Sequence, residues 1–68
     1  MSYTAITKNV DGWWIGWIEE IPGVNCQEKT HDKLLSSLKD TLLEALDLNK
    51  ADARNAAGSN FTEEKIMV

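Results

Sequence analysis

Hydrophobic and polar positions alternate through the first part of the chain. The stretch SYTAITK alternates and is rich in strand-forming residues, and WWIGWI, from Trp13 to Ile18, is a second run of this kind. Between them, NVDG ends in Asp-Gly, a dipeptide favoured in tight turns between antiparallel strands. Residues 2–18 are therefore predicted to form a β-hairpin.

A second turn and a third strand follow the hairpin. In EIPGV, Pro22 suits the second position of a type II turn, and Gly23 suits the third, where φ must be positive. The chain then reverses into VNCQEKT, residues 24–30, whose polar character is typical of an edge strand.

From Thr30 on, the spacing of the apolar residues becomes that of a helix. Apolar residues recur every three or four positions, on one stripe of a helix predicted over about residues 31–49: Leu34, Leu35, Leu38, Leu42, Ala45 and Leu46. Thr30 suits the N-cap, and Asp32 places a carboxylate where the helix dipole favours one. Leu38 and Leu42 lie at the centre of the stripe, so we expect them to be its most buried residues.

The C-terminal part carries weaker signals. NKADARNAAGSN has no apolar stripe, which predicts a ragged helix end and a loose connection over about residues 50–60. FTEEKIMV, residues 61–68, has enough apolar residues for a short fourth strand. The predicted fold is a single α+β domain, residues 1–68. A three-stranded antiparallel sheet carries one amphipathic helix in β-β-β-α order, with its core in residues 2–49 and a short C-terminal fourth strand as an option.

All three tryptophans lie in the second strand. Alternate residues of a strand point to opposite faces, which separates Trp13, Ile15 and Trp17 from Trp14, Gly16 and Ile18. Both faces are apolar, although a single helix covers only one face of such a sheet. Because Gly16 leaves room for a helix, we expect its face to meet Leu35, Leu38 and Leu42, and the other face to look outward.

The outward face is the candidate interface, since dense exposed aromatic groups are typical of protein contact surfaces. Its residues are Trp13, Ile15, Trp17, Glu19 and Glu20. The alternative is that these tryptophans lie flat over neighbouring strand residues as a second core. A domain this small buries only about 60% of its unfolded surface. We therefore expect a homodimer or larger homo-oligomer, formed through this face or through the edge of the third strand.

Charge narrows the classes of partner. Seven Lys and Arg against eleven Asp and Glu give a net charge of -4, and the basic residues are dispersed. Such a chain repels a phosphate backbone, so no direct nucleic-acid binding is expected, whereas a basic protein is attracted. Solubility alone also accounts for an acidic surface. One cysteine allows no internal disulfide, and no apolar run reaches the roughly 20 residues of a membrane span, which indicates a cytoplasmic protein without membrane contact.

No catalytic or metal-binding set is predicted. The side chains of Glu19 and Glu20 diverge on an extended segment, whereas a Mg²⁺ site needs converging carboxylates. Cys26 lies in mid-strand and His31 begins the helix, so they are not expected to pair, and four zinc ligands are lacking. We expect no enzymatic activity, no metal and no cofactor.

The run DGWWIGWIEEIPGVNCQEKT, followed by an amphipathic helix, resembles the N-terminal domain of HicB-type antitoxins. The resemblance covers about residues 3–48, with an echo in EEKIMV as a last strand, and is sharpest at Asp11-Gly12, Ile21-Pro22-Gly23, Thr30 and Leu35. Glu28-Lys29 stand where the family usually has Gly-Asp, and its acidic pair after the threonine is reduced to Asp32 followed by Lys33. Full-length members continue into a DNA-binding segment that this sequence does not contain.

The resemblance implies a partial RNase-H-like fold that binds rather than hydrolyses. It implies an antitoxin of a toxin-antitoxin system, which sequesters a small basic ribonuclease toxin by protein-protein contact and often forms a homodimer. The alternative is a stand-alone homo-oligomeric HicB-like protein of unassigned role, with no toxin partner.

Overall fold

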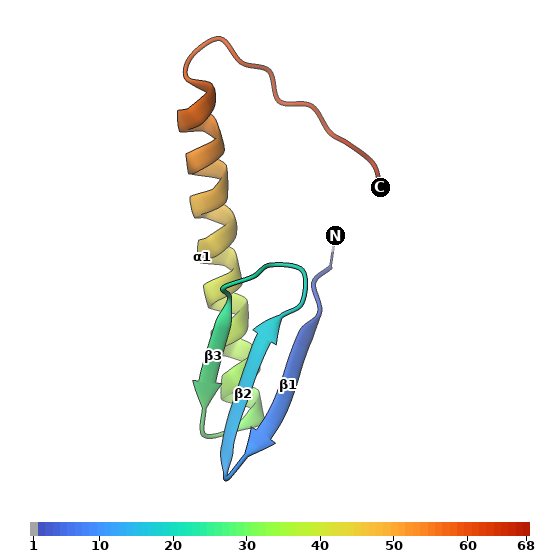
Figure 1. Ribbon diagram of the computed structural model, residues 1–68, viewed down its shortest axis with the longest axis vertical. Helices are drawn as coiled ribbons and strands as arrows, with labels where there is room; N and C mark the ends of the chain where they lie inside the picture. The colour runs from blue at the N-terminus through green and yellow to red at the C-terminus, as the bar shows by residue number, and fades with distance from the viewer. Residues whose placement is uncertain (1) are drawn as a thin grey trace.

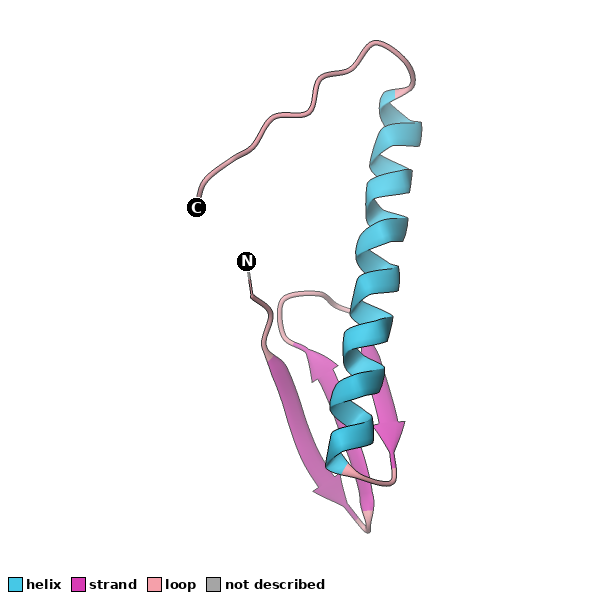
Figure 2. Ribbon diagram, turned by 180° about the vertical axis from the view of Figure 1, so that it is seen from behind, coloured by secondary structure: helices cyan, strands magenta, loops and turns pink. Residues whose placement is uncertain are grey.

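The computed structural model describes residues 2–68, which form one antiparallel sheet and one helix. The elements are β1 (Ala5–Val10), β2 (Trp13–Ile18), β3 (Asn25–Glu28) and α1 (His31–Ala57). The sheet order is β1-β2-β3, and the helix lies across one face of the sheet (Figures 1 and 2). The predicted α+β fold in β-β-β-α order is confirmed.

Two tight turns set the course of the strands. Asp11 and Gly12 have φ values of 52° and 85°, and positive φ at both central residues is what a type I′ hairpin turn requires. After β2, Gly23 has a φ of 91°, and the Val24 amide donates to the carbonyl oxygen of Ile21 at 3.5 Å. The turn predicted at Pro22 and Gly23 therefore forms, and it delivers Val24 into the core, 3% exposed.

The helix begins as predicted but ends later. The Thr30 hydroxyl accepts a hydrogen bond from the Lys33 amide at 3.2 Å, which confirms the N-cap. The helix runs for 27 residues to Ala57, so the prediction of a loose connection from residue 50 was wrong. Extending an existing helix needs no new nucleus, and the segment after Asn49 is rich in alanine, the best helix former. Gly58 ends the helix, with its amide donating to the Arg54 carbonyl at 3.0 Å.

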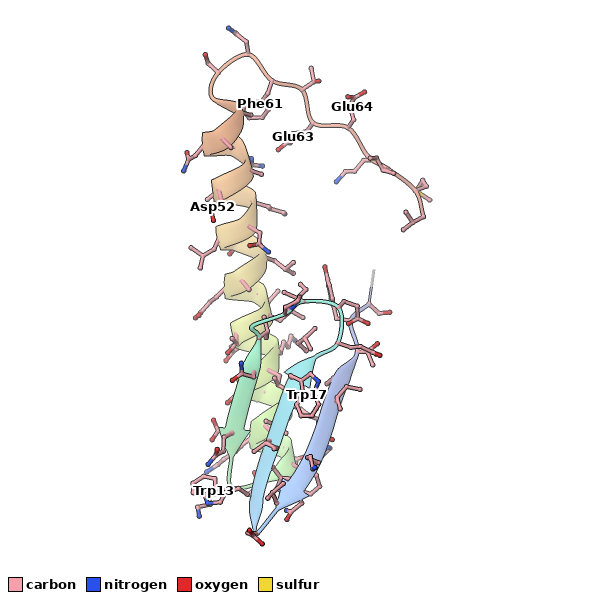
Figure 3. The ribbon with its side chains drawn as sticks, viewed as in Figure 1. Trp13, Trp17, Asp52, Phe61, Glu63 and Glu64 are labelled. Atoms are coloured by element: carbon pink, nitrogen blue, oxygen red, sulfur yellow. The ribbon has the colours of Figure 1, made fainter. Side chains whose placement is uncertain are left out.

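The optional fourth strand does not form within residues 2–68. At about 1.5 Å per residue, a helix of 27 residues is about 40 Å long, roughly twice the length of a six-residue strand. Its second half therefore extends beyond the sheet, and residues 61–68 run back from its far end without pairing with a strand (Figure 1). The segment turns back on the end of the helix, where Arg54 pairs with Glu63 at 3.0 Å and Phe61 lies by Ala53 and Ala57 (Figure 3).

The core lies between α1 and the Gly16 face of the sheet. Its buried residues are Ile18, Val24, Leu34 and Leu38, and Trp14, Leu42 and Ala45 are among the half-buried side chains packed against them. A Cβ atom on Gly16 would lie 3.1 Å from side-chain carbons of both Leu34 and Leu38. Gly16 therefore faces the helix at close range, and this confirms the predicted assignment of the two sheet faces.

One part of the predicted helix stripe was wrong. Leu35 is 41% exposed and Leu42 is only half-buried, whereas Leu34 is fully buried beside Leu38. The apolar stripe is wide enough to allow two rotations of the helix about its axis. The structure adopts the rotation that centres Leu34 and Leu38 over Gly16, and Leu35 then falls on the flank of the helix.

Polar contacts join the helix to β3. The Ser37 hydroxyl donates to the Glu28 carboxylate at 2.7 Å, and the Cys26 sulfur lies 3.4 Å from the Thr41 hydroxyl oxygen. Ser37 and Thr41 are four residues apart and lie on the flank of α1 that faces β3. They hold the helix over β2 and β3, with which it makes most of its contacts.

The neighbouring leucines Leu34 and Leu35 provide a matched test of this packing. Replacing Leu34 by Ala leaves a cavity beneath the helix and is expected to lower the free energy of unfolding by about 2–5 kcal/mol. Leu35→Ala removes the same atoms from an exposed flank and is expected to cost much less. Urea denaturation followed by far-UV circular dichroism measures both. A larger loss for Leu35→Ala than for Leu34→Ala would show that the helix is rotated differently.

Candidate protein interface

The sheet face opposite the helix is apolar and uncovered. The register pairs Ile6 with Trp17 and Val10 with Trp13, and directly opposite residues of an antiparallel pair share a face. These four side chains are each between 36% and 41% exposed, while Ile15 between them is half-buried. We call this surface the outer face; Figure 3 shows Trp13 and Trp17 towards its two ends.

The three tryptophans have different surroundings. Trp14 lies on the helix side, where its ring meets the His31 ring edge-on with centroids 4.8 Å apart. Trp13 lies on the outer face, and the Lys29 ammonium nitrogen sits 3.6 Å from its ring centroid, a cation-π contact. Trp17 also lies on the outer face and, at 41%, is slightly more exposed than Trp13. Trp14 therefore packs against the core, whereas Trp13 and Trp17 lie on the opposite face and are partly exposed.

The two predicted interface carboxylates lie at the Trp17 end of the sheet. The Glu19 amide donates to the Thr4 carbonyl at 2.9 Å, which continues the β1-β2 ladder by one pair. Strand alternation then places Glu19 on the outer face with Trp17. The Glu20 carboxylate instead accepts a hydrogen bond from the Thr4 amide at 2.7 Å, and this bond lowers the pKa of Glu20. Glu20 therefore helps to hold the start of β1 in place.

A shallow hollow lies beside Trp17 on the sheet. It has a volume of about 390 Å³ and is lined by residues of β2 and β3: Ile15, Gly16, Trp17, Asn25, Cys26 and Gln27. Asn25 is paired with Trp17 and Gln27 with Ile15, so polar side chains of β3 stand beside the apolar ones of β2 at this hollow.

Sequence reasoning missed the contribution of β1 and of Lys29. Ile6, Lys8 and Val10 pair with Trp17, Ile15 and Trp13 and therefore share the outer face. Counting back from the Asp11-Gly12 turn gives this pairing from the sequence. Lys29 follows the end of β3, where alternation also points it outward. The outer face thus carries Lys8 and Lys29 near its apolar residues, and Glu19 at one end.

Three further carboxylates lie on the solvent side of the helix. Asp40, Glu44 and Asp47 are exposed and recur at helical spacing, so they share one side of α1. Within residues 2–68 these carboxylates form no ion pair. Leu43, on the same side, is 51% exposed. We call this surface the acidic flank; the spacing of its carboxylates can be read directly from the sequence.

The residues with catalytic potential are not brought together. Cys26 contacts Thr41, whereas His31 packs on Trp14. Over the part of the chain that the structure describes, no three His, Cys, Asp or Glu side chains are grouped so that they could hold a metal ion. The helix, although long, is not apolar enough to cross a membrane.

No protein-family model matches the sequence, and no curated protein and no solved structure matches it.

The hydrogen bond between Glu20 and Thr4 should make the stability of the fold depend on pH. Because the bond lowers the pKa of Glu20 in the folded chain, its contribution is present above the unfolded pKa and is lost as pH falls through the folded pKa. Glu20→Gln should therefore be less stable than the parent at neutral pH, and the difference should shrink in acid. Thermal melts at a series of pH values measure it. A difference that stays constant between neutral and strongly acidic pH would contradict this role.

Proposed function

We propose that this chain is a non-catalytic binding module that sequesters a small basic protein by protein-protein contact. The partner implied by the resemblance to HicB-type antitoxins is a small ribonuclease toxin, and a cytoplasmic location is proposed with it. The observation that carries the proposal is the acidic flank. Three exposed carboxylates without ion-pair partners in residues 2–68 stand on one side of a continuous helix, in a chain with a net charge of -4.

Electrostatics favour the acidic flank over the outer face for this partner. Complementary charge accelerates encounter with a basic protein, and like charges across an interface oppose it. The outer face carries Lys8 and Lys29, and the Lys29 ammonium group is already placed over Trp13. A basic partner would have to displace these lysines there. On the flank it meets Asp40, Glu44 and Asp47 together with the exposed apolar side chain of Leu43.

The proposal assigns no catalytic step to the chain. Nucleophilic catalysis needs a nucleophile within hydrogen-bond reach of a base, and metal-assisted hydrolysis needs converging ligands. Cys26 is instead engaged with Thr41, and Glu20 with the Thr4 amide. Binding without chemistry is the role that these contacts support.

The second candidate is a stand-alone homo-oligomeric protein with no toxin partner. The outer face favours it, because Ile6, Val10, Trp13 and Trp17 expose apolar surface that a monomer gains nothing from leaving in water. The two candidates use different surfaces, so they can be separated by experiment.

Neutralising the acidic flank tests the first candidate. An affinity-tagged chain should capture a small basic protein from its native host, and the captured protein should cleave RNA once released. The triple variant Asp40→Asn, Glu44→Gln, Asp47→Asn should bind that protein about tenfold or more weakly at low salt, because steering and contact charges are both lost. Titration calorimetry with the purified partner measures the dissociation constant.

The matched control is the triple variant Asp52→Asn, Glu63→Gln, Glu64→Gln, which changes the net charge equally at the far end of the helix (Figure 3). It should bind nearly as well as the parent. Capture of no basic protein, or equal weakening by both triple variants, would defeat the proposal.

A further inference from the structure

The outer face has nearly the same pattern when read in either direction. Along β2 it presents Trp13, Ile15 and Trp17, with an aromatic residue on each side of a branched aliphatic one. Along β1 it presents a branched aliphatic residue on each side of Lys8, and the register sets Lys8 opposite Ile15. A half turn that reverses the strand direction about the level of Ile15 therefore places apolar positions on apolar positions.

We infer that the outer face binds a second copy of this chain, with the two sheets face to face and the two β2 strands antiparallel. The two-fold axis lies between the sheets and crosses the strands at Ile15. Trp13 of each copy then lies over Trp17 of the other, and Ile15 meets Ile15. Isologous contact of this kind uses one surface twice and closes as a dimer.

The hollow of the outer face fits this arrangement. It lies beside Trp17 and is bordered by the polar side chains of Asn25 and Gln27. In the antiparallel dimer, Trp13 of the other copy arrives at the level of Trp17, where the hollow can receive its indole ring. Aromatic rings packed with an offset gain more than rings stacked directly face to face.

Charge selects the antiparallel arrangement. Lys29 lies at the Trp13 end of the face and Glu19 at the Trp17 end. Antiparallel strands bring Lys29 of each copy towards Glu19 of the other, twice per dimer. Parallel strands would instead bring Glu19 against Glu19, where like charges oppose contact. Lys8 meets Lys8 in the antiparallel dimer, but it lies on an edge strand, where a long stem lets the ammonium group reach water.

The size of the face sets the expected strength. Three strands about 4.8 Å apart make a smaller contact than the standard interface of about 800 Å² per partner. We therefore expect a dimer with a dissociation constant in the micromolar range, in rapid exchange with monomer.

Sedimentation velocity on the parent chain and on variants with reversed charge at Glu19 or Lys29 tests the inference. The parent chain should pass from monomer to dimer between about 1 and about 500 µM. Glu19→Lys and Lys29→Glu should each weaken the dimer about tenfold, because each substitution is present in both copies and removes both ion pairs between Lys29 and Glu19. An equimolar mixture of the two variants should regain the parent's affinity, since both contacts in the mixed dimer are again between opposite charges.

The mixture is also the control for folding, because misfolded variants would not recover affinity on mixing; far-UV circular dichroism of each variant confirms it. A parent chain that stays monomeric at the highest concentration would overturn the inference. So would a Glu19→Lys chain that dimerises as well as the parent, or a mixture no tighter than its components. The acidic flank is intact in all these chains, so loss of the dimer and loss of a basic partner are observed separately.

Discussion

The close approach of α1 to β2 at Gly16 determines which face of the sheet the helix covers and which face stays exposed. A Cβ atom at this position would lie 3.0 Å from the Ile6 carbonyl oxygen and 3.1 Å from carbons of Leu34 and Leu38, so a larger residue would force the helix or the strand to move. With glycine there, two leucines pack directly on the backbone of the central strand. The helix then covers that face alone, and the tryptophan face stays open.

This one-sided packing separates two surfaces, one mostly apolar and one acidic. The sheet presents apolar side chains with Lys8, Lys29 and Glu19, while the solvent side of the helix presents Asp40, Glu44 and Asp47. A domain of this size has a thin core, and binding to a partner adds to its stability by mass action. We propose that the chain uses the apolar face for a second copy of itself and the acidic flank for a basic protein, so that the two contacts do not compete.

The fold was predictable from the sequence wherever the signal was local. The Asp-Gly and Pro-Gly turns, the Thr30 cap and the alternation in WWIGWI each act over a few residues, and the structure contains all of them. The choice between Leu34 and Leu35 was not predictable in this way, because it depends on the rotation of the helix over Gly16. The length of α1 was misjudged because an apolar stripe reports packing, whereas residues 50–57 remain helical beyond the sheet through propensity and the Gly58 cap. Among the interface residues, Trp13 and Trp17 followed from alternation, but Ile6, Val10 and Lys29 required the register.

Both surfaces depend on which face of β2 the helix covers, and nuclear Overhauser contacts in the isotope-labelled protein measure this. We expect contacts from the methyl groups of Leu34 and Leu38 to the α protons of Gly16, and none from these methyl groups to the side chains of Ile15 or Trp17. Contacts from the two leucines to Ile15 or to the Trp17 ring, with none to Gly16, would show that the helix covers the opposite face and would contradict the account.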